Sequence, residues 1–179
     1  MQLARTRLPI FLAAIVAALF AVTGAFADDW KLTGSGIRVK KVAIIDVNVY
    51  AISHYMKALP PAKSKQAVID METGKKFVWT MKRDVDEEKI KNALKDAFAM
   101  NGYGDQGKIG QFMSAFKGEL KEKASVTIAY DPDKKVTTVS TPGGTANIAG
   151  VEFMKAAWSI WFGKIDQPSL GDQLISKLP

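Results

Sequence analysis

The hydrophobic pattern of the chain changes character near its middle. Residues 37–55 are rich in β-branched and aromatic side chains, which favours strands, and the polar pair Lys40-Lys41 indicates one break that would make a hairpin. Residues 66–72 and 76–81 have the same character on either side of Thr73-Gly74. The first half therefore predicts four strands joined by short turns.

Helical spacing begins near residue 85. Apolar side chains recur at intervals of three and four, which predicts an amphipathic helix over residues 85–100, and Asp84 with Glu87 predicts a capping box at its start. The residues that carry this spacing are Ile90, Ala93, Leu94, Ala97 and Phe98. A turn at residues 101–105 separates it from a second predicted helix, marked by Ile109, Phe112, Met113 and Phe116.

The last third adds a hairpin and two helices. Residues 125–130 and 136–140 are predicted strands around Asp131-Pro132-Asp133, and residues 141–144 are a predicted loop. A third helix, with Gly163 as its C-cap, and a short helix over residues 169–178 follow. Strands and helices are grouped rather than alternating, which predicts an α+β fold with helices on one face of an antiparallel sheet.

The first 27 residues are predicted to be a signal peptide. Arg5 and Arg7 precede an uncharged apolar stretch over residues 8–22, and Ala25-Phe26-Ala27 is a cleavage pattern. The alternative is an uncleaved anchor, but the apolar stretch is shorter than the roughly 20 residues of a membrane-spanning helix. We expect residues 28–179 to be one periplasmic or secreted domain without a transmembrane segment.

Composition excludes several kinds of chemistry. The chain has no cysteine and one histidine, so disulfides, thiolate metal sites, Ser-His-Asp triads and multi-histidine zinc sites are not expected. We expect neither a metal nor a cofactor. The formal net charge is +7, but lysines and acids are interspersed, which is typical of a solvated surface, so nucleic acid is not an expected partner.

Four features are candidates for function, and each also has a structural explanation. Arg38 follows Gly36-Ile37 beside an apolar strand, where a guanidinium can bind a carboxylate or phenolate; it can equally be a surface arginine. Tyr103 lies between two glycines and can project into a cleft or cover the core. The aromatic stripe Trp158, Trp161 and Phe162 can wall a ligand pocket or pack in the core, and the lone His54 favours packing over catalysis.

The order of several short motifs resembles the chalcone isomerase-like family in its short bacterial exported form. The resembling segments are residues 32–38 with Gly34, Gly36 and Arg38, the pair Val49-Tyr50, residues 82–85, residues 101–105 with Phe112 and Phe116 behind them, and residues 150–163. The resemblance covers nearly all of residues 28–179. It implies an open-faced β-sandwich, in which a large antiparallel sheet carries helices on one side.

The resemblance also bears on activity. In the plant enzymes of the family an arginine holds the oxyanion during ring closure and a tyrosine assists, and Arg38 and Tyr103 match these positions. Three further polar positions of the enzymes fall at Ile45, Gly110 and Met154. A site that has lost these donors stabilises the transition state poorly, which argues against efficient flavonoid chemistry.

Some plant members of the family are described as fatty-acid binders. The sequence therefore predicts a non-catalytic binder of a small apolar carboxylate or phenolate, such as a fatty acid, with Arg38 and Tyr103 at the head group. The residues predicted around the tail are Val47, Phe112, Met154 and Trp158. Two alternatives remain open: an intramolecular lyase or isomerase with Arg38 as electrophile, assisted by Tyr103, and an envelope protein with a closed cleft that binds a protein partner.

Overall fold

A single antiparallel sheet organises the protein, whose computed structural model describes residues 29–179; the predicted signal peptide lies outside the described residues. Its strands are β1 (Lys31–Val42), β2 (Ile45–Met56), β3 (Lys75–Met81), β4 (Ser125–Asp131), β5 (Val136–Thr141) and β6 (Gly144–Ala149). Each strand pairs with the next along the chain, so the order in the sheet is β1-β2-β3-β4-β5-β6.

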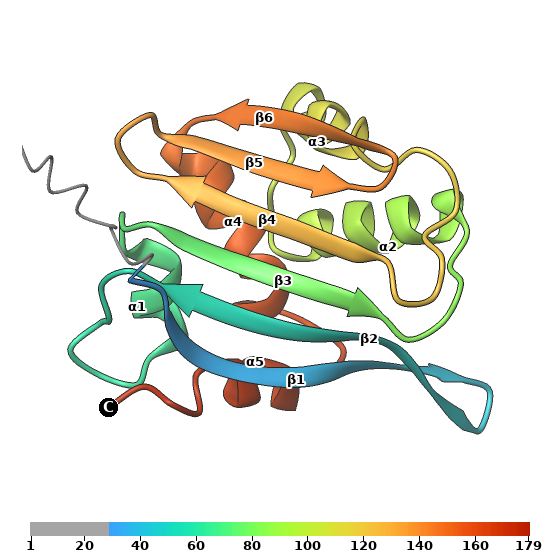
Figure 1. Ribbon diagram of the computed structural model, residues 1–179, viewed down its shortest axis with the longest axis horizontal. Helices are drawn as coiled ribbons and strands as arrows, with labels where there is room; N and C mark the ends of the chain where they lie inside the picture. Colours follow the sequence, from blue (N-terminus) through green and yellow to red (C-terminus); the bar gives the residue numbers. More distant parts are fainter. Residues whose placement is uncertain (1–28) are drawn as a thin grey trace, which may run out of the picture.

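The helices all lie behind one face of this sheet (Figure 1). They are α1 (Lys65–Asp70), α2 (Glu87–Met100), α3 (Gln106–Met113), α4 (Val151–Phe162) and α5 (Pro168–Leu174). Helix α4 is central and touches α1, α2 and α5, while α5 packs on β1 and α3 packs near β6. The α+β fold and the open-faced architecture predicted from the sequence are confirmed.

Side-chain alternation explains why only one face is covered. In β3, the side chains of Lys75, Phe77, Trp79 and Met81 are buried toward the helices, and the residues between them are on the other face. Helix α4 is apolar around most of its circumference, as expected for a helix enclosed on several sides. The core therefore forms one layer between the sheet and the helices, with α4 at its centre.

Two predicted elements were wrong. Residues 66–72 form no strand: α1 occupies Lys65–Asp70, with the Ser64 hydroxyl accepting a hydrogen bond from the Ala67 backbone N–H at 3.2 Å. The predicted loop at residues 141–144 is only a tight turn, and it leads into β6, which the sequence analysis missed. Both segments are too short for a periodic pattern to distinguish strand from helix or loop.

Two local details also differ from the prediction. The β1–β2 turn lies at Ala43-Ile44, where Ala43 has a φ of 55°, rather than near Lys40-Lys41. The predicted capping box is absent, because α2 begins at Glu87 and the Asp84 carboxylate accepts from the Glu122 backbone N–H at 2.7 Å. Asp84 thus fastens the start of α2 to the segment before β4.

Two glycines of the Gly-x-Gly-x-Arg segment bring α5 against β1. A Cβ on Gly34 would lie within 2.7 Å of the Leu174 carbonyl oxygen, and one on Gly36 would lie 2.7 Å from the Leu170 side chain. Both distances are shorter than van der Waals contact. At Gly34 the neighbours are backbone atoms, so no side chain fits there, whereas at Gly36 the side chains of Leu170 and Gln173 would have to move. This close packing holds the loop before α5 beside Arg38.

A buried hydrogen-bond chain links β1, β2, α4 and α5. The Trp158 Nε1–H donates to His54 Nε2 at 2.8 Å, so the neutral ring carries its hydrogen on Nδ1 and donates to the Thr33 hydroxyl at 2.7 Å. That hydroxyl donates in turn to the Leu174 carbonyl oxygen at 2.7 Å. His54 is fully buried and packed, as one reading of the sequence expected.

Burial, reinforced by the positive charge of Lys75, lowers the pKa of His54 well below its ordinary value. The unfolded chain therefore binds a proton that the folded chain does not, and the free energy of unfolding is expected to fall as the pH drops below about 6.5. Because the chain has one histidine, an imidazole NMR titration is unambiguous. We expect Nδ1–H tautomer signals that do not titrate between pH 8 and 5.5; an inflection near pH 6.5 in the folded protein would contradict this arrangement.

Candidate functional site

A groove of about 900 Å³ lies between the outer half of the β1–β2 hairpin, α2 and the segment that joins α4 to α5. Its walls are mainly aliphatic. The apolar side chains that line it are Val42, Ile45, Val47 and Val49 from the hairpin, Val85, Ile90, Ala93, Leu94, Ala97 and Met100 from α2 and its approach, and Ile160, Trp161 and Ile165 from the C-terminal part. This volume lies within the range of small-molecule sites.

The groove exists because the hairpin extends beyond the rest of the sheet. The last β2–β3 pair joins Tyr50 to Met81, so residues 39–49 have no third strand beside them. A register shift between Arg38 and Val39 bends the hairpin, and it allows the adjacent residues Val49 and Tyr50 both to line the groove. The inward face of the extension is therefore left facing α2 across open space.

Arg38 and Tyr50 meet at the inner end of the groove, as direct partners across β1 and β2. The Tyr50 hydroxyl accepts a hydrogen bond from Trp161 Nε1 at 3.1 Å, and its ring stacks on Trp79 with centroids 4.7 Å apart. Burial raises the pKa of Tyr50, against the opposing effects of the Trp161 hydrogen bond and the Arg38 charge. At neutral pH the hydroxyl is therefore protonated and can donate to an anion.

The guanidinium of Arg38 is held by the segment before α5. Nη2 donates to Asp166 Oδ1 at 2.6 Å, and Nη1 donates to Gln167 Oε1 at 3.2 Å and to the Val39 carbonyl oxygen at 2.9 Å. The Gln167 amide also accepts from the Val39 N–H at 2.9 Å. These contacts fix the orientation of the guanidinium. Only 15% of the Arg38 side chain is exposed.

Asp166 shows that this position accommodates a carboxylate. Its second oxygen accepts from Lys40 Nζ at 3.0 Å, so two cations share one carboxyl group. Partial burial alone would raise the pKa of Asp166, but Lys40 and Arg38 together hold it below its ordinary value. Cations outnumber acids along the groove: the cations are Arg38, Lys40, Arg83, Lys89 and Lys164, and the acids are Asp84, Asp96 and Asp166.

Two of the residues predicted to bind ligand, Arg38 and Val47, line this groove. Tyr103 does not. It lies in the turn between α2 and α3, where its ring packs against Phe98 and Phe153 at centroid distances of 5.7 and 5.9 Å. The structure thus gives Tyr103 the core-covering position that was the alternative reading of its glycine-flanked turn.

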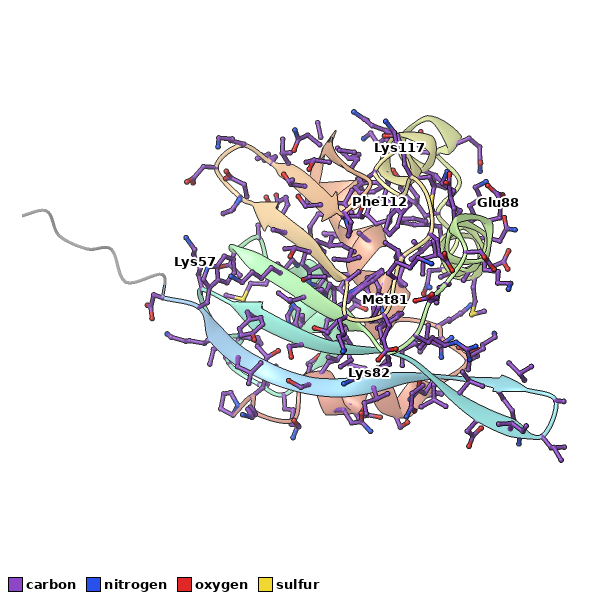
Figure 2. All side chains as sticks on the ribbon, turned by 45° about the vertical axis from the view of Figure 1, so that its right-hand side comes forward. Lys57, Met81, Lys82, Glu88, Phe112 and Lys117 are labelled. Atoms are coloured by element: carbon purple, nitrogen blue, oxygen red, sulfur yellow. The ribbon has the colours of Figure 1, made fainter. Side chains whose placement is uncertain are left out.

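The three other predicted tail residues are fully buried in the core and do not line the groove. Phe112, on the buried face of α3, packs among other aromatic rings, and Figure 2 shows it inside the layer between sheet and helices. Met154 and Trp158 lie on α4, and Trp158 contacts His54. For the aromatic stripe of α4, core packing describes Trp158 and Phe162, while Trp161 also reaches the inner end of the groove.

Tyr50, Asp166 and Gln167 belong to the groove site but were not among the predicted site residues. Tyr50 was noted only as the end of an apolar strand. A turn at Ala43-Ile44 alone would pair Arg38 with Val49, and the register shift between Arg38 and Val39 pairs it with Tyr50 instead. The apolar face of α2 was predicted only as one side of an amphipathic helix; Ile90 and Leu94 are buried on this face and also line the groove. No local pattern marks Asp166 or Gln167, because α5 must dock on β1 before they reach Arg38.

Within residues 29–179, no helix is both long and apolar enough to cross a membrane. The same residues contain no cluster of three or more histidine, cysteine or acidic side chains suited to a metal ion.

The sequence model described as chalcone isomerase-like matches residues 19–174. The chain belongs to the chalcone isomerase-like family. Among solved structures, this family member is similar to the crystal structure of a fatty-acid binding protein from Arabidopsis thaliana, with a TM-score of 0.67 and 14% identity over 83% of this chain and 87% of that one. At that identity the likeness concerns the fold. No curated protein matches the sequence.

Proposed function

We propose that this chalcone isomerase-like protein binds a small apolar carboxylate, such as a fatty acid, in the periplasm and does not transform it. The observation that carries the proposal is the pairing of Arg38 with Tyr50 at the inner end of an aliphatic groove of about 900 Å³. The guanidinium and the hydroxyl provide donors for the carboxylate, and the groove provides surface for the chain. The fatty-acid binding protein of similar fold supports this choice of ligand.

The energetics favour a ligand with a long apolar chain. Each CH₂ group removed from water contributes about 0.8 kcal/mol, so about ten such groups contribute on the order of 8 kcal/mol before the costs of immobilisation. The carboxylate adds a charge-assisted hydrogen bond in a largely buried setting. The head group therefore sets orientation and selectivity, and the tail supplies most of the affinity.

The incoming carboxylate competes with Asp166. That side chain already occupies Arg38 and is 43% exposed, so it can be released to solvent when a ligand arrives. Lys40 also pairs with the Asp166 carboxylate, and it can neutralise either Asp166 or the ligand carboxylate, whichever is not bound to Arg38. Asp166 is thus an internal competitor that lowers affinity for the external ligand.

Binding is favoured over the two alternatives by the same geometry. The raised pKa of Tyr50 makes the tyrosine a poor base at neutral pH, which argues against an intramolecular lyase that would use it. An envelope protein with a closed cleft would have this volume filled by its own side chains, whereas about 900 Å³ is open.

Two substitutions at the head group are expected to change affinity in opposite directions. Arg38→Gln removes the charge and should weaken binding of a fluorescent fatty acid at least ~10-fold, the loss expected for a charge-assisted hydrogen bond. Asp166→Asn removes the competitor and should strengthen binding several-fold. The measurement is fluorescence titration of delipidated protein, with competition by unlabelled palmitate and by hexadecanol, its uncharged analogue.

Tyr103→Phe is the control, because Tyr103 lies away from the groove, and its affinity should equal that of the wild type. Absence of saturable binding, or equal competition by palmitate and hexadecanol together with an unaffected Arg38→Gln variant, would refute the proposed site. The periplasmic part is tested on the same preparation. Export is supported if protein from the periplasmic fraction has the intact mass of a chain that begins at Asp28. A full-length chain found in the cytoplasm contradicts export.

A further inference from the structure

The tip of the β1–β2 hairpin carries exposed aliphatic side chains without a partner. Among the described residues, five large hydrophobic side chains are exposed, and three of them are at this tip: Val42 at 58%, Ile44 at 91% and Ile45 at 65%. Figure 1 shows the hairpin projecting past the other strands. Exposing adjacent aliphatic side chains is unfavourable in water, so such a tip is typical of a surface that meets an apolar phase.

Cations lie behind the tip, on the hairpin and beside its base. Lys40 and Lys41 immediately precede it on β1 and are exposed, with Asp46 opposite Lys41. The Lys82 N–H donates to the Val49 carbonyl oxygen at 2.9 Å, which holds the exposed pair Lys82-Arg83 beside the hairpin. Aliphatic side chains at the end of a projection with lysines and arginines behind them are complementary to a bilayer that has anionic head groups.

The tip is continuous with the groove. Val42 and Ile45 are cross-strand partners at the end of the hairpin, and both line the groove. Val47 and Val49 continue the apolar row toward Arg38 and Tyr50. An amphipathic anion can move along this row with its tail in contact with aliphatic side chains throughout, so the outer end of the groove opens where the tip would meet a membrane.

We propose that residues 42–45 insert into the surface of an anionic lipid bilayer, and that the groove exchanges its ligand there directly with the membrane. The exchange of ligand with the membrane rests on the proposed function, whereas the membrane contact does not. The tip suits a bilayer better than a protein partner, because four residues offer little of the roughly 800 Å² per partner that a stable protein interface buries. Lipid needs no such area, since aliphatic side chains are removed from water individually.

The test is flotation of residues 28–179 with vesicles of phosphatidylcholine alone and of phosphatidylcholine with 30% phosphatidylglycerol. The wild type should associate with the anionic vesicles, more weakly at 500 mM than at 50 mM salt. Ile44→Asp should reduce the association at least ~10-fold, the loss expected for one large aliphatic side chain. Aspartate suits a two-residue turn, so the fold should be unaffected.

Ile37→Asp is the matched control, with Ile37→Ser as a second variant if the first is unfolded. Ile37 is 40% exposed on the same hairpin but does not line the groove or belong to the tip, so association should stay within about twofold of the wild type. Equal losses in Ile44→Asp and Ile37→Asp would overturn the proposal. So would a concentration-dependent dimer that Ile44→Asp abolishes, because the tip would then belong to an interface between copies.

Fatty-acid titration of the same proteins separates the two proposals. A wild type that binds the fluorescent fatty acid in solution but does not float with vesicles overturns the membrane contact and leaves the groove intact. A wild type that floats but binds no fatty acid supports the membrane contact and overturns the proposed function. If both hold, Ile44→Asp should bind fatty acid from solution normally and take it from vesicles at least ~10-fold more slowly.

Discussion

Replacing Gly34 with alanine is expected to lower the free energy of unfolding by about 3 kcal/mol or more. The new Cβ would lie 2.6 Å from the Leu174 carbonyl carbon and 2.7 Å from its oxygen, with the Gln173 carbonyl oxygen closer still. These are backbone atoms of α5, so no side-chain rotation relieves the overlap. The helix would have to move from β1, and the hydrogen bond from the Thr33 hydroxyl to Leu174 would be lost with it.

Urea denaturation followed by circular dichroism measures this effect. The matched control is Gly110→Ala, the same substitution in helix α3, where a Cβ meets nothing within 4 Å. It should be neutral or stabilise the protein by about 0.5–1 kcal/mol, because alanine favours helix more than glycine does. Equal stabilities of the two variants would show that α5 does not pack on Gly34 as described.

The second large effect concerns Lys75, a lysine that is fully buried on the helix-facing side of β3. Its Nζ donates to the carbonyl oxygens of Val68 and Ile69 at 2.7 and 2.9 Å, at the C-terminal end of α1, and lies 5.0 Å from the ring of Trp158. Lys75→Met leaves two buried carbonyl groups without these donors. We expect the free energy of unfolding to fall by about 2–4 kcal/mol near pH 9.

The pKa of Lys75 determines how the destabilisation by Lys75→Met changes with pH. Burial lowers the pKa of Lys75 from 10.5 to about 7, with a further contribution from Lys155. Between these two pH values the unfolded chain binds the proton and the folded chain does not, so the contribution of Lys75 to stability rises with pH across that interval. The wild type should therefore gain about 2–3 kcal/mol from this residue between pH 7 and 9.5. Lys75→Met should lack that gain, and its destabilisation should be smaller at pH 6 than at pH 9.5.

The comparison requires denaturation curves at both pH values. Lys76→Met is the control, since Lys76 is the next residue but lies on the other face of β3, with its Nζ 4.2 Å from the ring of Trp30. It makes the same substitution without touching α1, so its loss of stability should be smaller than that of Lys75→Met at pH 9.5. If Lys75→Met and Lys76→Met behave alike, Lys75 is not buried as the structure describes.

Local sequence patterns were sufficient for most elements and for the fold class. The period of three to four over residues 85–100 and the alternation in residues 76–81 each result from one face being buried, and that requirement is visible within a single segment. The grouping of strands before helices indicated the α+β architecture, and the order of several short motifs, among them residues 34–38, pointed to the family that is confirmed. Arg38 and Val47 were identified as candidate ligand contacts from the same region, and both line the groove.

The composition of the site depended on tertiary structure. Tyr50 faces Arg38 because of the hairpin register, while Tyr103 packs over the core against Phe98 and Phe153. Asp166 reaches Arg38 only after α5 docks on the glycines of β1. The groove itself results from β1 and β2 extending beyond their neighbours, a difference in strand length that no single segment records. The sequence by itself determined most elements and the fold class, because these depend on local burial, whereas the choice of tyrosine and the open groove were decided by which surfaces meet when the chain packs.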